Sequence, residues 1–168
     1  YVNTSRSIIL LKYLVSTLEK MEIDVFYLFD IRVQEVFNFI DKKNCKFIKN
    51  SNFERFKFYK DMRFSNLKKV LCFGNAPPVI RLDIPVYVYF HNQTLIKTHQ
   101  DMNFKNYILT LCKQGFVHVY KKNVDIWFVQ NNYMRENLAL KYFNGFDNHI
   151  INMPFYPEIL YPDNIKRI

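Results

Sequence analysis

The stretches VLCFGNAPP (70–78) and PVYVYFHN (85–92) decide the fold of this chain. Each contains a short apolar run rich in β-branched and aromatic residues, and each run stops at polar, turn-forming residues. Such runs, without polar alternation, are typical of strands buried on both faces of a parallel sheet. In open α/β sheets, ligands bind beyond the carboxyl ends of the strands. We therefore expect Asn75, His91 and Asn92 to lie together in such a crevice.

Predicted strands and helices alternate along the rest of the sequence. Besides the two runs above, which predict strands over 69–74 and 85–90, further strands are expected over 24–29, 45–48, 125–129 and 149–153. Helical patterns begin after a cap at Thr4 or Ser5, and recur over 53–68, over about 104–120 and after 132. This alternation predicts βαβ units, and hence a doubly wound, mostly parallel Rossmann-like α/β sheet with helices on both faces.

Apolar spacing supports three of these helices. In the first, one apolar face is formed by Ile8, Leu11, Val15 and Leu18. In the helix over about 104–120, one face is shared by Ile108, Leu111, Cys112 and Phe116. The helix after 132 is expected to end near Gly145, as at a glycine C-cap.

Composition limits the classes of protein that fit. A chain of 168 residues with 49% hydrophobic content is long enough for one domain with a full core. Only 3 glycines are present, and no G-x-G-x-x-G motif occurs, which argues against a dehydrogenase or methyltransferase of the Rossmann cofactor class. The 3 cysteines have no metal-ligand spacing, so we expect no metal site and a reduced, cytoplasmic setting. No segment has the apolar length of a membrane span.

The net charge of +9 predicts an anionic partner: a membrane surface, a nucleotide or nucleic acid. Basic and aromatic residues are interleaved over 42–69, which favours peripheral contact with an anionic membrane. The alternative is a solvated helix face whose aromatic rings pack inward. A non-enzymatic, basic nucleic-acid-binding α/β domain is the second functional hypothesis, although no known nucleic-acid-binding motif occurs and that partner is not expected.

Four motifs in order carry a family resemblance: NAPP (75–78), HN (91–92), QNNYM (130–134) and IINMPF (150–155). Their order resembles the N-terminal, acceptor-side half of retaining GT-B glycosyltransferases. The resemblance implies sugar transfer from a nucleotide sugar to a glycan or lipid-linked acceptor, with no further cofactor and no metal. Together with a composition rich in Lys, Asn, Ile and Phe, it implies bacterial surface polysaccharide synthesis in the cytoplasm, at the inner face of the membrane.

The resemblance also implies how the chain is divided. Residues 1–155 would form the acceptor-side domain, and 156–168 would be a linker toward a C-terminal domain that binds the donor. The pair of glutamates that marks the donor side of the family has no counterpart in this sequence. A complete enzyme is therefore expected to need further chain, and this part alone is expected to be inactive.

By resemblance, His91 faces the donor sugar as the catalytic histidine, where a neutral imidazole can accept or donate a hydrogen bond. The alternative is a buried structural histidine at a strand end. The expected substrate-binding residues are Asn75, Pro77, Arg81, Asn92, Lys97, Gln130 and Asn131. The alternatives stay open that the proline segment is a plain turn and that Arg81 and Lys97 are ordinary solvated charges.

The polar loop at the start of the first helix is expected to contact the donor phosphates through Thr4, Ser5 and Arg6. In the family this loop usually contains glycines, which let backbone amides approach the phosphates. This sequence has none there, so hydroxyl groups and a guanidinium would take their place.

Overall fold

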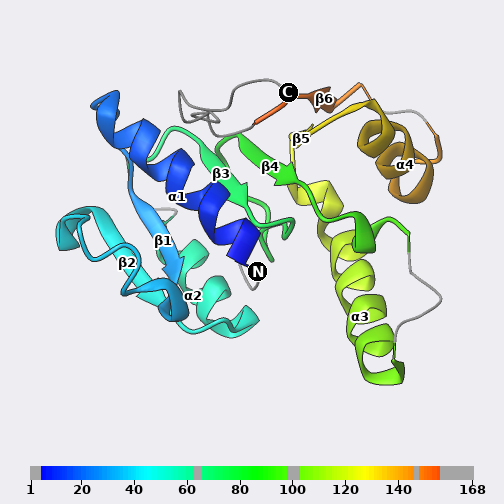
Figure 1. Ribbon diagram of the computed structural model, residues 1–168, viewed down its shortest axis with the longest axis horizontal. Helices are drawn as coiled ribbons and strands as arrows, with labels where there is room; N and C mark the ends of the chain where they lie inside the picture. The colour runs from blue at the N-terminus through cyan, green and yellow to red at the C-terminus, as the bar shows by residue number, and fades with distance from the viewer. Residues whose placement is uncertain (1–4, 63–65, 98–102, 146–147, 156–168) are drawn as a thin grey trace, which may run out of the picture.

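The computed structural model describes residues 5–62, 66–97, 103–145 and 148–155 (Figure 1). Within them, six strands form two sheets, and all neighbouring strands are parallel. One sheet pairs β1 (Tyr27–Asp30) with β2 (Cys45–Ile48). The other has the order β3 (Val70–Phe73), β4 (Val86–Phe90), β5 (Ile126–Val129) and β6 (Ile150–Asn152).

The same described residues form four α-helices and four short 3-10 helices, which precede or connect the strands. The α-helices are α1 (Ser5–Lys20), α2 (Asn52–Met62), α3 (Phe104–Tyr120) and α4 (Asn132–Tyr142). The 3-10 helices are η1 (Ile31–Val33), η2 (Lys42–Asn44), η3 (Gln93–Leu95) and η4 (Lys121–Asn123). The predicted α/β class with parallel strands flanked by helices is confirmed, and none of the described helices is long and apolar enough to cross a bilayer.

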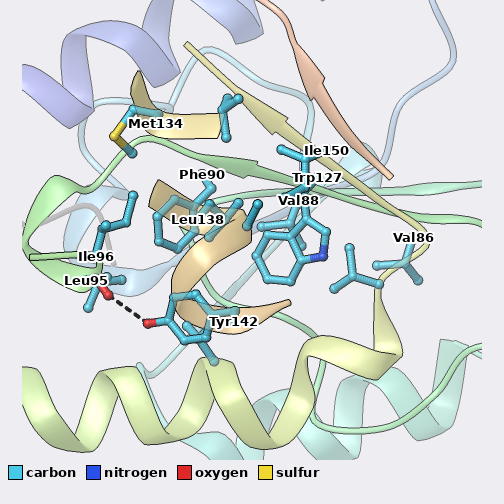
Figure 2. Close-up of a cluster of buried hydrophobic side chains, with 14 of the residues drawn as sticks. Val86, Val88, Phe90, Leu95, Ile96, Trp127, Met134, Leu138, Tyr142 and Ile150 are labelled. Atoms are coloured by element: carbon cyan, nitrogen blue, oxygen red, sulfur yellow. Dashed lines mark hydrogen bonds between the residues drawn. The ribbon is translucent and has the colours of Figure 1, made fainter. Parts of the chain in front are cut away.

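The larger sheet is built around alternate residues of β4. Val86, Val88 and Phe90 are fully buried and pack with Trp127 of β5. Residues of α4 cover this face of the sheet, and Figure 2 shows Leu138 and Tyr142 among these side chains. The cluster also includes residues from α2 and α3: Tyr59, Met62 and Val117. This core therefore joins three helices to one face of β3–β6.

The smaller sheet has its own hydrophobic cluster, which includes Leu11 and Val15 of α1. In it, the rings of Phe29 and Phe37 stack with their centroids 4.5 Å apart. Phe73 of β3 packs against this cluster, although β1 and β3 belong to different sheets. In the part of the chain that the structure describes, side-chain packing therefore joins the two sheets, rather than the single continuous ladder that the sequence predicts.

The ends of two helices show how well local signals work. The glycine C-cap is confirmed, because Gly145 has a φ of 97° and donates its N–H to the Ala139 carbonyl at 3.0 Å. The predicted helix over 53–68 is too long at its carboxyl end. α2 ends at Met62, and residues 66–69 are not helical because they lead directly into β3.

In α3 the predicted boundaries are confirmed, but the apolar face lies on the outside. The helix buries Thr110, Gln114 and Val117. Gln114 donates its side-chain amide to the Thr94 carbonyl at 3.2 Å, so a polar contact helps to hold the helix on η3. Most of the apolar face noted in the sequence is exposed, namely Ile108, Leu111 and Cys112.

Two leucines of α4 provide a direct test of the larger core. Leu138 is fully buried, whereas Leu140 is 68% exposed on the same helix. We expect Leu138→Ala to lower the free energy of unfolding by about 2–5 kcal/mol, because it leaves a cavity. Leu140→Ala should change it by less than about 0.5 kcal/mol. Urea unfolding followed by circular dichroism measures both, and equal losses would contradict this packing.

Candidate functional site

Asn75 joins the carboxyl ends of β3 and β4. Its side-chain Oδ1 accepts hydrogen bonds from the backbone N–H of His91 at 2.6 Å and of Asn92 at 2.9 Å. Asn75 is almost fully buried. Its backbone has a φ of 64°, in the left-handed region that asparagine tolerates better than most residues. The predicted meeting of these residues at one edge of the sheet is therefore confirmed.

His91 is half-buried, and its imidazole lies among aromatic rings at this edge. Its ring centroid is 5.7 Å from that of Phe73 and 6.0 Å from that of Tyr89. Within the described residues, Nδ1 of His91 is the one buried side-chain nitrogen or oxygen without a hydrogen bond. Burial lowers the pKa of the imidazole below its usual value, although the nearby backbone of Tyr89 acts in the opposite direction. The histidine is therefore neutral at pH 7.

The segment that follows β6 reaches back to the same edge. The ring of Phe155 lies 6.0 Å from that of Phe73 and 6.1 Å from that of Tyr89, measured between centroids. It also lies 5.2 Å from the ring of Tyr13 in α1. Tyr89 donates its hydroxyl to the Met153 carbonyl at 3.3 Å. The sequence motif contained Phe155, but only the tertiary structure shows that its ring is part of the aromatic surroundings of His91.

Two of the other predicted residues, Asn92 and Asn131, have their side-chain oxygens engaged in helix caps. Asn92 Oδ1 accepts from the backbone N–H of Thr94 at 3.0 Å and so caps η3. Asn131 Oδ1 accepts from the N–H of Met134 at 2.9 Å and caps α4. Gln130 directly follows β5 and is half-buried. Lys97 is exposed in the loop after β4.

The Pro77 segment is a buried support. Arg55 of α2 donates Nη2 to the carbonyl of Pro77 at 3.0 Å, and its guanidinium lies over the rings of Tyr59 and Phe116. Asn123 donates its side-chain amide to the Pro78 carbonyl at 2.9 Å. Sequence reasoning counted Arg55 only as one charge of the basic region over 42–69. Its contacts now show that it holds the loop next to the site.

The predicted place of Arg81 is wrong. Its guanidinium forms an ion pair with Asp125, which directly precedes β5, and donates to the Lys122 carbonyl at 3.2 Å. Asp125 also accepts from the N–H of Val86, the first residue of β4, at 2.7 Å. Arg81 therefore lies at the amino ends of β4 and β5, because its loop leads back to the start of β4. His91 is at the opposite end of the sheet.

The first loop can be placed only in part. Thr4 lies outside the described residues, whereas Ser5 and Arg6 are the first residues of α1. Figure 1 shows α1 running opposite to β1, so the helix begins at the end where β1 finishes. In the ranges that the structure describes, no group of three or more His, Cys, Asp or Glu residues could hold a metal ion.

Comparison with protein-family models, with curated proteins and with solved structures finds no match to this chain. The geometry describes a neutral, half-buried imidazole whose backbone is held by Asn75 and whose ring lies beside those of Phe73 and Tyr89. Such a group can accept or donate a hydrogen bond to a hydroxyl of a bound ligand. The bonds from Asn75 are made by its side chain to the backbone, so they position His91 without using its imidazole.

The two bonds of Asn75 can be tested by substitution. We expect Asn75→Ala to lower the free energy of unfolding by about 2–4 kcal/mol, since two backbone donors lose their acceptor and alanine is disfavoured at positive φ. Asn75→Asp keeps an acceptor oxygen and tolerates this backbone, so it should lose clearly less. Urea unfolding measures both variants. Equal, small losses would show that the contact does not hold the strand ends.

The lowered pKa of His91 predicts a pH dependence. The folded state disfavours protonation of this imidazole, so its contribution to stability is full above about pH 6.5 and decreases as the pH falls toward the lower folded pKa. The wild-type protein should therefore lose more stability than His91→Gln between about pH 7.5 and 5.5. Urea unfolding at several pH values measures this difference. Parallel curves for the two proteins would contradict it.

Proposed function

We propose that this chain is the acceptor-side domain of a retaining GT-B-type glycosyltransferase, which transfers a sugar from a nucleotide sugar to a glycan or lipid-linked acceptor. The main support is the way Asn75 positions the backbone of His91, so that its half-buried, neutral imidazole lies at the carboxyl edge of a parallel sheet. The order of the sequence motifs gives this edge its interpretation as a sugar site.

In this proposal His91 binds a hydroxyl of the donor sugar. A neutral imidazole fits this role, because it can form a hydrogen bond without adding a charge in a partly buried place. The half-buried rings of Phe73 and Phe155 supply the apolar surface that lines most small-molecule sites. Gln130 lies at the adjacent strand end and is a second candidate for a hydroxyl contact.

The beginning of α1 is the proposed place for the donor phosphates. A helix amino end offers free backbone N–H groups and a favourable dipole for an anion. Ser5 and Arg6 begin this helix, so no glycine is needed for the backbone amides to be available. The nucleotide itself would be held by a second domain joined through 156–168, a segment outside the described residues.

Further parts of the proposal rest on the resemblance alone. They are a catalytic cycle without a metal, a role in bacterial surface polysaccharide synthesis, and a place in the cytoplasm at the inner face of the membrane. Pro77 and Asn92 would act by shaping the acceptor side, since their positions are held by contacts of the protein itself. Arg81 has no part in this site.

Binding of nucleotide sugars tests the proposal on this chain. Titration with UDP-glucose and GDP-mannose, followed by NMR, should shift the amide signals of His91, Asn92 and Gln130. His91→Ala should weaken binding by about tenfold, as expected for one lost hydrogen bond to a buried group. His118→Ala, which changes an exposed histidine of α3, is the matched control and should bind like the wild type.

Turnover tests the reaction. In the full-length protein, His91→Ala should reduce sugar transfer while His118→Ala leaves it unchanged. Full activity of His91→Ala would remove this residue from the mechanism. Nucleotide sugars that shift only signals far from the carboxyl ends of β3–β5 would contradict the proposed site.

A further inference from the structure

We infer that α3 is an amphipathic helix that lies in the surface of an anionic lipid bilayer, with its outward apolar face in the interface. The proposed function takes a place at the membrane from the resemblance alone, whereas this inference names the surface that makes the contact and would hold whether or not the protein transfers a sugar. It also moves the membrane contact from the region over 42–69, where the sequence predicts it, to α3.

The outer face of α3 is largely apolar, with the exposed His118 as a polar residue on it. Phe104 is 80% exposed, Val119 is 59% exposed, and Ile108 and Leu111 are each at least 40% exposed. These positions fall on one side of a helix at 3.6 residues per turn. The residues that α3 buries, Thr110, Gln114 and Val117, lie on another side. A helix of a globular protein normally turns its apolar side to the core, so this arrangement is the reverse of the usual one.

The charge of α3 determines which partner fits. The helix contains no acidic residue, and its two charged residues are Lys105 and Lys113. Of the two lysines that follow directly in η4, Lys122 is exposed, whereas Lys121 donates Nζ to the Tyr142 carbonyl. Basic residues close to an anionic leaflet strengthen binding to it. The apolar face, with the exposed Lys105 and Lys122 near its two ends, matches a surface with acyl chains below anionic headgroups.

A second copy of the chain fits this face less well. Pairing two such faces would join two copies of a protein that already has a net charge of +9 each, without any acidic residue of α3 to offset it. α3 has 17 residues and buries Thr110 and Gln114 on its inner side, so it can lie in the plane of the membrane interface while it stays packed on the protein. In Figure 1, α3 extends beyond the strands, and its amino-terminal turns are the part farthest from them.

The region over 42–69 offers a weaker surface of the same kind. In α2, Phe53 and Phe56 are exposed, but Tyr59 is buried in the core. Arg55 is engaged by the carbonyls of Ala76 and Pro77. Lys46 lies over the ring of Phe58, 5.7 Å from its centroid. Two aromatic residues therefore face outward there, whereas α3 has a longer apolar face.

Co-sedimentation with vesicles tests the inference. The wild-type protein should bind vesicles of phosphatidylcholine mixed with phosphatidylglycerol, should bind pure phosphatidylcholine much less, and should be released from the mixed vesicles by salt. Phe104→Ser combined with Ile108→Ser should weaken binding to the mixed vesicles by about tenfold or more. The reason is that the two variant side chains have little apolar surface to bury in the bilayer. Phe53→Ser combined with Phe56→Ser is the matched control on α2 and should have a much smaller effect.

The single exposed cysteine of the chain gives a direct reading. Cys112 of α3 is exposed, whereas Cys45 is buried and Cys72 is half-buried, so a thiol-reactive, polarity-sensitive dye will label Cys112 selectively. Its emission should shift to the blue when mixed vesicles are added. Emission of Trp127, the one tryptophan and fully buried, checks that each variant is folded.

Several results would overturn the inference. These are a larger loss of binding for the α2 pair than for the α3 pair, equal binding to neutral vesicles, or unchanged dye emission. Self-association in sedimentation experiments that is abolished by the α3 substitutions would instead identify a second copy as the partner of this face. Because none of these readings uses a nucleotide sugar, failure here is distinguishable from failure of the proposed sugar site.

Discussion

The site depends on one side chain that replaces missing secondary structure. Past the last paired residues of β3 and β4, the backbone N–H groups of His91 and Asn92 donate to Oδ1 of Asn75. This acceptor lets the β4 chain leave the sheet without leaving these donors unsatisfied, which would be costly in a partly buried place. The orientation of His91, and hence the environment of its imidazole, follows from this contact.

The environment of His91 then sets its chemistry. Rings from β3 and β4 lie beside the imidazole, the ring of Phe155 packs against those two rings, and burial keeps the imidazole neutral. Arg55 and Asn123 hold the loop that follows Asn75. A neutral, half-buried imidazole beside aromatic rings is suited to binding a polar, uncharged group, and a sugar hydroxyl is such a group. This is the physical basis for the proposed glycosyltransferase role.

Local signals predicted much of the fold and part of the site. The strands over 45–48, 69–74 and 85–90 were recognisable because they are short apolar runs that end at turn residues. The meeting of Asn75 and His91 followed from the rule that parallel strands end at one edge. Contacts between distant segments were not predictable in this way. Arg55 bonds to residues more than 20 positions away, and Phe155 reaches back to β3 and β4, and neither contact has a periodicity that a sequence pattern could show.

By itself, then, the sequence determined the parallel α/β class, most helix and strand positions, and the pairing of Asn75 with the end of β4, because these depend on hydrophobic runs and short-range turn chemistry. Only the tertiary structure decided that Arg81 lies at the amino ends of the strands and that the apolar face of α3 is exposed. The reason is that periodicity defines which residues share a face but not which neighbour covers it. That choice is made by packing, and here a polar contact between Gln114 and Thr94 helps to hold the less apolar side of α3 inward.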